Sequence, residues 1–419
     1  MDKFLYAVTH NRLLVLLGGI LLLGAGVIAW VRLPIDAFPD VSNNQVMVLT
    51  EAAGYTPGEI ERLITFPIET QMGGLPGVMN VRSLSKTGLS QVVVIFEDSV
   101  DTYFARQLVL ERLLQAREKL PEGIEPEMGP ISTGLGEIYQ YIVEAVYYCP
   151  EHREEFSREP GTCRQCKKSF LESEHGLAEL RTIQDWLISP QLRKLPGINE
   201  VNSFGGYVKQ YHIIPDPELL IKYDITVSDI LEAVEKNNAN TGGGYIIRDW
   251  EQINVMTRGL VQGIPDIGMI VLNAENGTPV YLNDVAKVEI GHQLRNGAVT
   301  CDGRGEAVIG MTVMLKGANS KTVVDRVKKE IPAISKSLPP GVILTPFYDR
   351  TDLIQACIST VSNAIFQGGI LVIVILFLLL WDLRAALTVT IALPLTAAAT
   401  FLLMSWQEIT ANLMSLGGL

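Results

Sequence analysis

The chain has 419 residues, enough for two or three domains of about 150 residues each. Hydrophobic residues make up 47% of it and charged residues 19%, whereas roughly one quarter of the residues in soluble proteins are charged. Because the charged residues are missing from three long stretches, this composition argues against a soluble enzyme, a disordered chain and a collagen-like chain.

The net charge is −12, from 34 basic and 46 acidic residues, and the acidic excess lies between residues 33 and 351. Binding to nucleic acid needs a basic face, so nucleic acid is not an expected partner. A cationic partner or cargo is compatible with this charge, although solubility alone also explains it.

The first stretch without charged residues, 13–31, predicts an uncleaved membrane anchor. A spanning helix needs about 20 apolar residues, whereas the apolar part of a signal peptide usually has only about 7–15. Arg12 and Arg32 flank the stretch, and no small-x-small cleavage site follows it. A signal peptide is therefore the less favoured alternative.

The next segment, 33–134, predicts a β-α-β-β-α-β unit. Thr56-Pro-Gly-Glu59 has the pattern of a helix N-terminus, Asp101 is a second N-cap, and Gly88 marks a turn between two strands. The expected strands are 46–50, 78–83, 91–96 and a short one after Gly123. This order is typical of the split βαβ (ferredoxin-like) fold, a sheet with two helices on one face.

An internal repeat follows. Leu75-Pro-Gly-Val matches Leu195-Pro-Gly-Ile, and Leu120-Pro-Glu-Gly matches Leu338-Pro-Pro-Gly, in the same order and each after a helical pattern. The second copy is expected to contain strands 138–148, 198–204, 307–315 and 342–347, with helices at about 177–194 and 320–337. Its extra middle, about 205–292, predicts an inserted docking subdomain with a helix from Val227 and a turn or loop tip at 240–244.

Three of the five cysteines belong to one short motif, with a histidine, at Cys149-x2-His152 and Cys163-x2-Cys166. Two short-spaced pairs on tight turns can close a tetrahedron of thiolates and imidazole, and soft ligands of this kind suit zinc or Cu(I). We predict a metal site there; a disulfide between Cys163 and Cys166, or a loop without metal, are the alternatives. His175 is a possible competing ligand.

Cys301 and Cys357 stand alone, and His10, His212 and His292 are isolated. Phosphate-loop, Gly-x-Ser-x-Gly and His-Glu-x-x-His motifs are absent from the sequence, so the chain is not expected to be an enzyme.

Two further spans are expected at about 363–381 and 385–406, joined by a tight hairpin, with Pro394 inside the second one. Lys3 and Arg12 precede the first span and Arg384 lies in the hairpin, so the positive-inside rule places these residues in the cytoplasm and the long acidic segment outside. Trp30 and Trp381 are expected to be interfacial anchors.

The last residues, 409–419, begin like another helix but are too short to cross a membrane, so we expect the sequence to be a fragment of a longer protein. The three complete spans contain no ionisable residue, which a proton-driven transporter normally needs. Either the chain is not part of such a transporter, or the coupling acid lies beyond Leu419.

The opening motif Leu33-Pro-Ile-Asp-Ala-Phe-Pro-Asp-Val-Ser-Asn-Asn-Gln-Val46 closely resembles the start of the periplasmic region in heavy-metal efflux pumps of the resistance-nodulation-division superfamily. Further matches cover nearly the whole chain: 64–69, 74–77, 279–286, Tyr348-Asp-Arg350 and 412–418. The insertion at 149–170 departs from the common pattern and resembles small heavy-metal-binding modules, except that Lys167-Lys168 replace the usual Gly-Met.

The resemblance implies the N-terminal portion of a trimeric proton/heavy-metal-cation antiporter in the bacterial inner membrane. Its partners would be a periplasmic adaptor and an outer-membrane channel. The alternatives are a pump for drugs or other organic substrates, and a membrane-anchored metal-binding module that does not transport.

The resulting fold class is an α+β membrane protein with duplicated split-βαβ porter subdomains. The predicted divisions are a first transmembrane helix (1–32), a first porter subdomain (33–134), a second one in two parts (135–204 and 293–350) with a metal-binding-like insertion (148–170), the docking subdomain (205–292), and helices two, three and the start of four (351–419).

Overall fold

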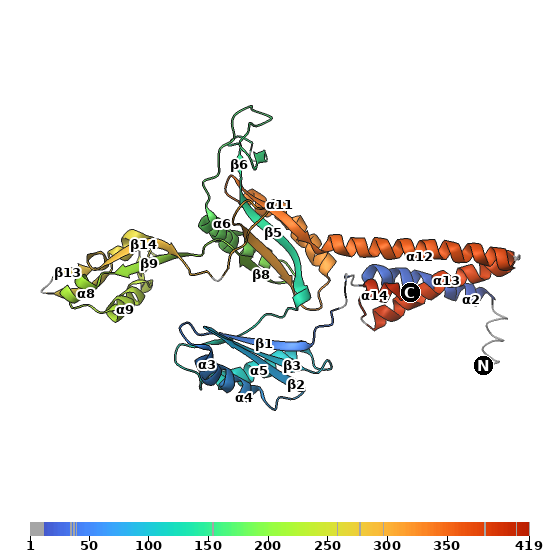
Figure 1. The fold of residues 1–419 in the computed structure, drawn as a ribbon, viewed down its shortest axis with the longest axis horizontal. Coiled ribbons are helices and arrows are strands. Elements are labelled where there is room, and N and C mark those ends of the chain that lie inside the picture. Colours follow the sequence, from blue (N-terminus) through green and yellow to red (C-terminus); the bar gives the residue numbers. More distant parts are fainter. Residues whose placement is uncertain are drawn as a thin grey trace.

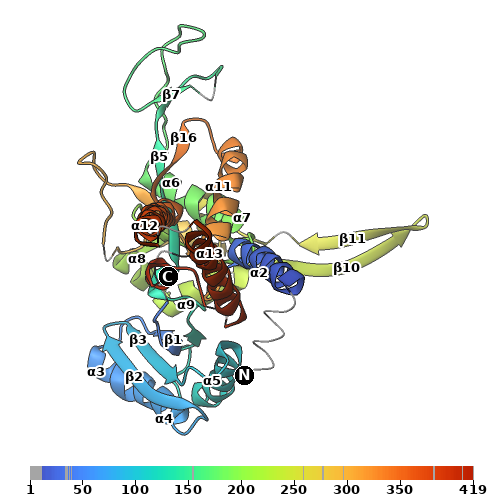
Figure 2. The ribbon, with the colours of Figure 1, turned by 90° about the vertical axis from the view of Figure 1, so that its right-hand side faces the viewer.

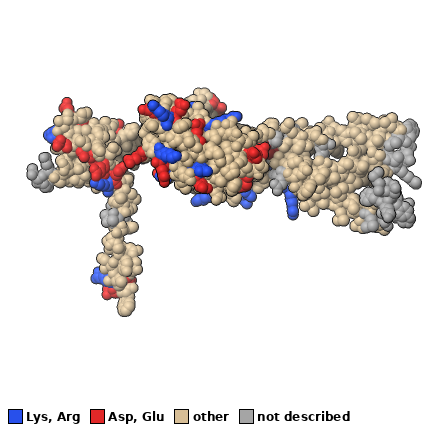
Figure 3. All heavy atoms as spheres, turned by 90° about the horizontal axis from the view of Figure 1, so that it is seen from below, with Lys and Arg blue, Asp and Glu red and all other residues tan. Residues whose placement is uncertain are grey.

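The computed structural model describes residues 12–418, apart from 34, 35, 37, 39, 153, 154, 258, 276, 277, 296, 381, 382 and 408. The molecule is elongated, with a third α/β unit at one end, a group of apolar helices at the other, and two units with four-stranded sheets between them (Figure 1). In Figure 3, charged side chains cover the α/β units and are sparse on the helical end.

The first unit has the strand order β2-β3-β1-β4, the order expected for a split βαβ fold. Its first helix begins as predicted, because the Thr56 N–H donates to the Glu59 carboxylate at 2.9 Å; Asp101 caps the second helix through the Phe104 N–H at 2.9 Å. Its elements are β1 (Asn44–Glu51), α3 (Pro57–Ile60), α4 (Phe66–Met72), β2 (Val78–Lys86), β3 (Leu89–Phe96), α5 (Thr102–Arg117) and β4 (Pro126–Met128).

The second unit repeats this topology in the order β16-β5-β15-β8. The expected single strand 138–148 is wrong in one detail: it is interrupted at Val146, where the pairing with β16 ends in a 2.8 Å bond from the Val146 N–H to the carbonyl of Gly341, the residue before that strand. The elements are β5 (Glu137–Ala145), β6 (Tyr147–Tyr148), α6 (Leu177–Ile183), α7 (Ser189–Arg193), β8 (Ile198–Phe204), β15 (Val308–Met314), α11 (Ser320–Ser337) and β16 (Val342–Asp349).

The two units also share an irregularity. A five-residue π-helical segment joins α3 to α4 (Glu61–Thr65) and another joins α6 to α7 (Gln184–Ile188). Each is followed by a proline, Pro67 or Pro190, whose missing N–H removes one α-helical hydrogen bond. A shared defect of this kind agrees with the internal repeat.

The third unit is entered and left through one antiparallel strand pair, β9 (Lys209–Pro215) with β14 (Ala286–His292), as an insertion into the second unit requires. Leu282 and Val285 are the most buried residues of its small core. It also contains α8 (Pro217–Lys222), α9 (Val227–Asn237), β10 (Thr241–Arg248), β11 (Glu251–Thr257), α10 (Ile264–Gly268), β12 (Val271–Glu275) and β13 (Thr278–Tyr281).

The expected loop tip at 240–244 is wrong. These glycines lie in β10, where a register shift between Gly242 and Tyr245 uses their conformational freedom, and Gly244 has φ +80°. The turn is instead made by Asp249 and Trp250, both with positive φ, and the β10–β11 hairpin projects far from the body of the molecule (Figure 2).

Among the residues that the structure describes, three helices are long and apolar enough to cross a membrane: α2 (Arg12–Arg32), α12 (Arg350–Leu380) and α13 (Leu383–Trp406). The predicted start of the second helix near residue 363 is wrong, because α12 begins at Arg350, directly after β16. Pro394 is inside α13 as expected. Lys3, His10 and Trp381 lie outside the described residues.

The helices pack closely. A Cβ on Gly26 of α2 would overlap Ala398 of α13, so a residue without a side chain allows the backbones to approach. The rings of Trp30 and Phe401 lie 4.7 Å apart beside this contact. A last short helix, α14 (Leu413–Gly417), is capped by Asn412.

Candidate metal centre

The four predicted ligands lie in a lobe that extends beyond the end of β5. We call residues 148–171 the Cys/His lobe. Its base is β6 paired with β7 (Phe156–Ser157), together with a backbone bridge in which Tyr148 and Leu171 exchange two 2.9 Å hydrogen bonds. Figures 1 and 2 show the lobe projecting away from the membrane helices.

Each half of the ligand set is organised by a tight turn. The His152 N–H donates to the Cys149 sulfur at 3.4 Å, and the Cys166 N–H donates to the Cys163 sulfur at 3.5 Å. The second turn is closed by a 2.8 Å bond from the Cys163 N–H to the Lys168 carbonyl. The x2 spacing thus places both members of each pair on the same side of a turn.

The turns bring all four ligand atoms within 4.8 Å of one another. The Cys149 sulfur lies 3.5 Å from the Cys166 sulfur, and the His152 Nδ1 lies 3.7 Å from Cys149 and 3.5 Å from Cys163. Zinc–sulfur and zinc–nitrogen bonds of normal length give tetrahedron edges of about 3.6–3.8 Å. The cluster therefore has the size and the donor set of a tetrahedral site.

The thiols differ in acidity. Burial opposes ionisation of Cys149, but hydrogen bonds from the backbone and side chain of His152 outweigh it and lower the pKa of this thiol to about 6. Burial raises the pKa of the Cys163 thiol to about 11. Cys149 is therefore available as a thiolate near neutral pH, whereas Cys163 has to lose its proton when a metal binds.

Charged groups surround the cluster. Lys168 pairs with Glu151, and the Glu155 carboxylate accepts a 2.6 Å hydrogen bond from the Arg164 N–H. Lys168 is one of the two residues that replace the Gly-Met of similar modules. Its pKa is raised, first by the hydrogen bond to Glu151 and to a smaller extent by Cys166 and Cys149. A cation beside the cluster favours the thiolates.

The other sequence candidates lie elsewhere. His175 is not part of the cluster; its Nδ1 lies 2.9 Å from a Glu179 oxygen. His292 stacks on Tyr207 with ring centroids 4.5 Å apart. All five cysteines are free, so the alternative disulfide between Cys163 and Cys166 is absent.

Sequence reasoning did not find Arg158, which joins the lobe to the second unit through Glu144 at 2.8 Å. No local pattern indicates this contact, since it depends on how the lobe folds back on the sheet.

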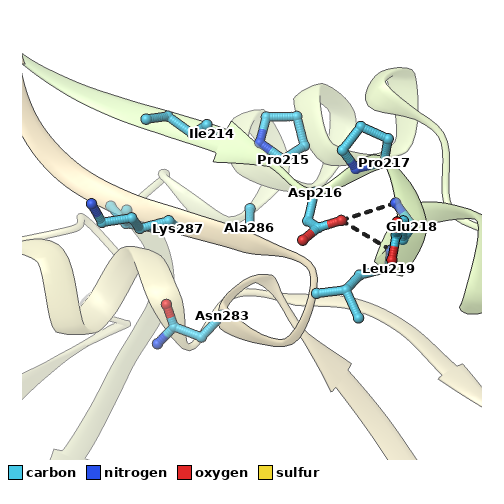
Figure 4. A pocket seen from close by; sticks show the side chains of 10 residues that line it. Ile214, Pro215, Asp216, Pro217, Glu218, Leu219, Asn283, Ala286 and Lys287 are labelled. Carbon is cyan, nitrogen blue, oxygen red and sulfur yellow. Dashed lines mark hydrogen bonds between the residues drawn. The ribbon is translucent and has the colours of Figure 1, made fainter.

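The third unit has an open depression of about 990 Å³ (Figure 4). Its most prominent acid, Asp216, accepts hydrogen bonds from the Glu218 and Leu219 N–H groups at 2.9 and 3.4 Å and thereby caps α8. Within the described residues, the Cys/His lobe is the place where ligand side chains of this kind come together.

Comparison with solved structures places the fold. The chain superposes on a crystal structure of a heavy metal efflux pump with a TM-score of 0.83 and 31% sequence identity, covering 98% of this chain and 38% of that one.

Curated proteins named for metal resistance and cation efflux also resemble this chain. The chain is 45% identical over 418 residues to the cobalt-zinc-cadmium resistance protein CzcA of Cupriavidus metallidurans, covering 100% of this chain and 38% of the relative. It is 38% identical over 410 residues to the cation efflux system protein CusA of Escherichia coli, covering 98% of this chain and 37% of the relative. The chain thus spans less than two fifths of the length of these relatives.

The resemblance to the heavy-metal efflux branch of the resistance-nodulation-division superfamily is confirmed by these relatives, whose names are those of transporters rather than enzymes. Since the sequence profile of the AcrB/AcrD/AcrF family matches residues 5–419, the chain belongs to that family.

Proposed function

We propose that the chain is part of an inner-membrane pump that exports heavy-metal cations by proton antiport. The observation that carries this proposal is the 45% identity, over the whole chain, to a protein named for cobalt, zinc and cadmium resistance. Three apolar helices able to span a membrane, with the α/β units between the first and second of them, support it.

The same proposal sets the location and the partners. The positive-inside rule puts the α/β units in the periplasm, where a periplasmic adaptor and an outer-membrane channel would complete a tripartite system. The predicted division into porter and docking subdomains is part of this proposal.

The β10–β11 hairpin supports self-association, which the proposed homotrimer requires. It presents apolar side chains to solvent along most of its length, and Trp250 at its tip is fully exposed. A projecting arm of this composition suits insertion into another copy of the chain. The exposed residues include Tyr245, Ile246, Ile247, Trp250 and Met256.

Metal tolerance tests the transport proposal. The full reading frame containing this chain should raise the tolerance of a metal-sensitive bacterial host to zinc, cobalt, cadmium or copper, and leave its tolerance to organic drugs unchanged. The reverse result would favour the alternative, an organic-substrate pump of the same superfamily.

We further infer that Cys149, His152, Cys163 and Cys166 hold one zinc or copper ion. Four protein ligands close the site completely, which favours a structural zinc over an ion in transit. Metal content measured on purified, reduced protein should be one ion per chain at this site and should fall in Cys163→Ser. The matched control is Cys357→Ser, which removes a thiol in α12, outside the lobe. Absence of metal from the reduced wild type would end this assignment.

A membrane-anchored metal-binding module that does not transport is the second candidate, favoured by the position of the lobe away from the spans. It predicts bound metal without any gain in tolerance, so the two measurements together separate it from the pump.

A further inference from the structure

The Cys/His lobe has almost no apolar core. Among its described residues, Cys149 and Cys163 are the two that are buried, and both are ligands. A segment this small folds stably only with a disulfide, a metal or an external support, and the cysteines are free. With no disulfide, the supports left to the lobe are an ion that would join its two turns and its contacts with the second unit.

The folded lobe is fixed to the second unit at its base. Gly341, between α11 and β16, has φ +80°, and a Cβ there would lie 2.7 Å from the Tyr148 ring. The ring thus lies directly against the backbone that leads into β16.

A second attachment lies at the end of β7. The Arg158 guanidinium donates from Nε and Nη2 to one oxygen of Glu144, at 3.1 and 2.8 Å, and from Nη2 to the Thr345 hydroxyl at 3.4 Å. Thr345 also donates to Glu144 at 3.1 Å. The Glu144 side chain is only 12% exposed, so its charge depends on these donors. One lobe residue thereby joins the edge strand β16 to its neighbour β5.

Arg158 also forms part of the wall of a cavity of about 370 Å³. Cys301 and Arg304 also line it, and the Arg304 Nη2 lies 3.4 Å from Glu144 and 3.5 Å from the Cys301 sulfur, so both arginines reach the same carboxylate. His175 lines the same cavity. The cavity thus lies between the base of the lobe and the sheet, with a half-buried thiol inside it.

We propose that the metal ion bound in the Cys/His lobe holds Arg158 in place over this cavity, so that metal occupancy controls access to Cys301. The ion folds the lobe, and the folded lobe places Arg158 on Glu144 and Thr345. Loss of the ion releases the lobe, and with it the wall that Arg158 provides. This proposal rests on the metal site of the proposed function and adds a regulatory consequence to it.

The test is alkylation of Cys301 by a maleimide, followed by peptide mass spectrometry, in full-length protein purified in detergent with and without zinc. Zinc should slow labelling of Cys301 about ten-fold, as local protection of a cavity residue does. Arg158→Gln should abolish this protection while still binding one zinc ion. Arg164→Gln, an exposed arginine of the same lobe, should behave as wild type.

Cys163→Ser treated with zinc should show no protection, which excludes direct binding of zinc to Cys301. If the wild type binds zinc at the lobe but labels Cys301 equally fast with and without it, or if Arg158→Gln keeps the protection, this inference is wrong and the metal site stands. If the wild type binds no zinc, the metal site itself fails.

Discussion

Arg350, at the start of α12, binds Asp36, which follows α2, through Nε at 2.9 Å and Nη2 at 2.8 Å. The two residues are 314 positions apart, and their side chains are only 4% and 16% exposed. Arg350 also donates to the carbonyl of Leu135, which precedes β5. One guanidinium therefore connects the first span, the second span and the second unit.

Arg350→Met should destabilise the protein by about 3 kcal/mol, because it removes the guanidinium that donates to the largely buried Asp36 carboxylate. The measurement is thermal unfolding in detergent, with Lys329→Met on the exposed face of α11 as control. Adding Asp36→Leu to Arg350→Met should recover part of the loss, since both charges are then absent. An Arg350→Met protein as stable as the control would contradict the role of the pair.

Gly310→Ala should destabilise the second unit by about 2 kcal/mol through overpacking. Gly310 pairs with Tyr141 across β15 and β5, and a Cβ would overlap the ring of this fully buried tyrosine. The ring cannot move freely, because its hydroxyl donates to Gln184 at 3.0 Å. Gly58→Ala, in α3 with open space around it, is the control and should be neutral or slightly stabilising. Equal melting temperatures for the two variants would refute this reasoning.

Acid should weaken the junction between α11 and β16. Burial acts to raise the pKa of Asp349, but hydrogen bonds from Lys328 and Thr351 outweigh it and hold the pKa below its ordinary value. The stabilisation is therefore complete above about pH 4, the unfolded value, and is lost as the pH falls through the lower folded value.

The free energy of unfolding at pH 7 should accordingly be about 1 kcal/mol higher for the wild type than for Asp349→Asn. The value is modest because Lys328 is partly exposed. The difference should vanish once the pH falls below the lowered pKa of Asp349 in the folded state, which melting curves across pH would show. The pKa of Lys328 is raised, first by its hydrogen bond to Asp349, so the contribution should also disappear in strong alkali. A difference that does not change with pH would rule out the ion pair as its source.

Trp250→Ser combined with Ile247→Ser should weaken self-association. Both side chains are exposed on the β10–β11 hairpin, so the change removes apolar area without touching the core of the third unit. Multi-angle light scattering of the detergent-purified protein should show a smaller mass than for the wild type at the same concentration. Leu294→Ser, an equally exposed residue outside the hairpin, is the control. An unchanged mass in the double variant would show that the hairpin has no part in self-association.

The secondary structure of both four-stranded units was predictable because its signals are local. Thr56 and Asp101 cap their helices as their sequence context indicates, and Gly88 forms the expected turn. The glycines at 242–244 were misinterpreted as a turn because glycine is also favoured at a β-bulge. The early start of α12 was missed because residues 350–362 are too polar for an interior membrane position, although they continue the helix outside it.

The ligand geometry was predictable for the same reason. Two x2 spacings determine two turns, and the ten residues between them are few enough to bring the turns together. Metal binding itself stays a prediction. The contacts of Arg158 with Glu144 and of Arg350 with Asp36 were not predictable, since each joins segments whose proximity is a product of the completed fold.

The absence of any loop between β16 and α12 has a mechanical consequence. Asp349 ends the strand and Arg350 begins a helix of 31 residues, about 46 Å of rigid rod. Because no flexible residues separate the two elements, a tilt of α12 within the bilayer should also rotate β16, the edge strand that carries Thr345. Movement of α12 in the lipid and movement of the second unit outside it should therefore be mechanically coupled.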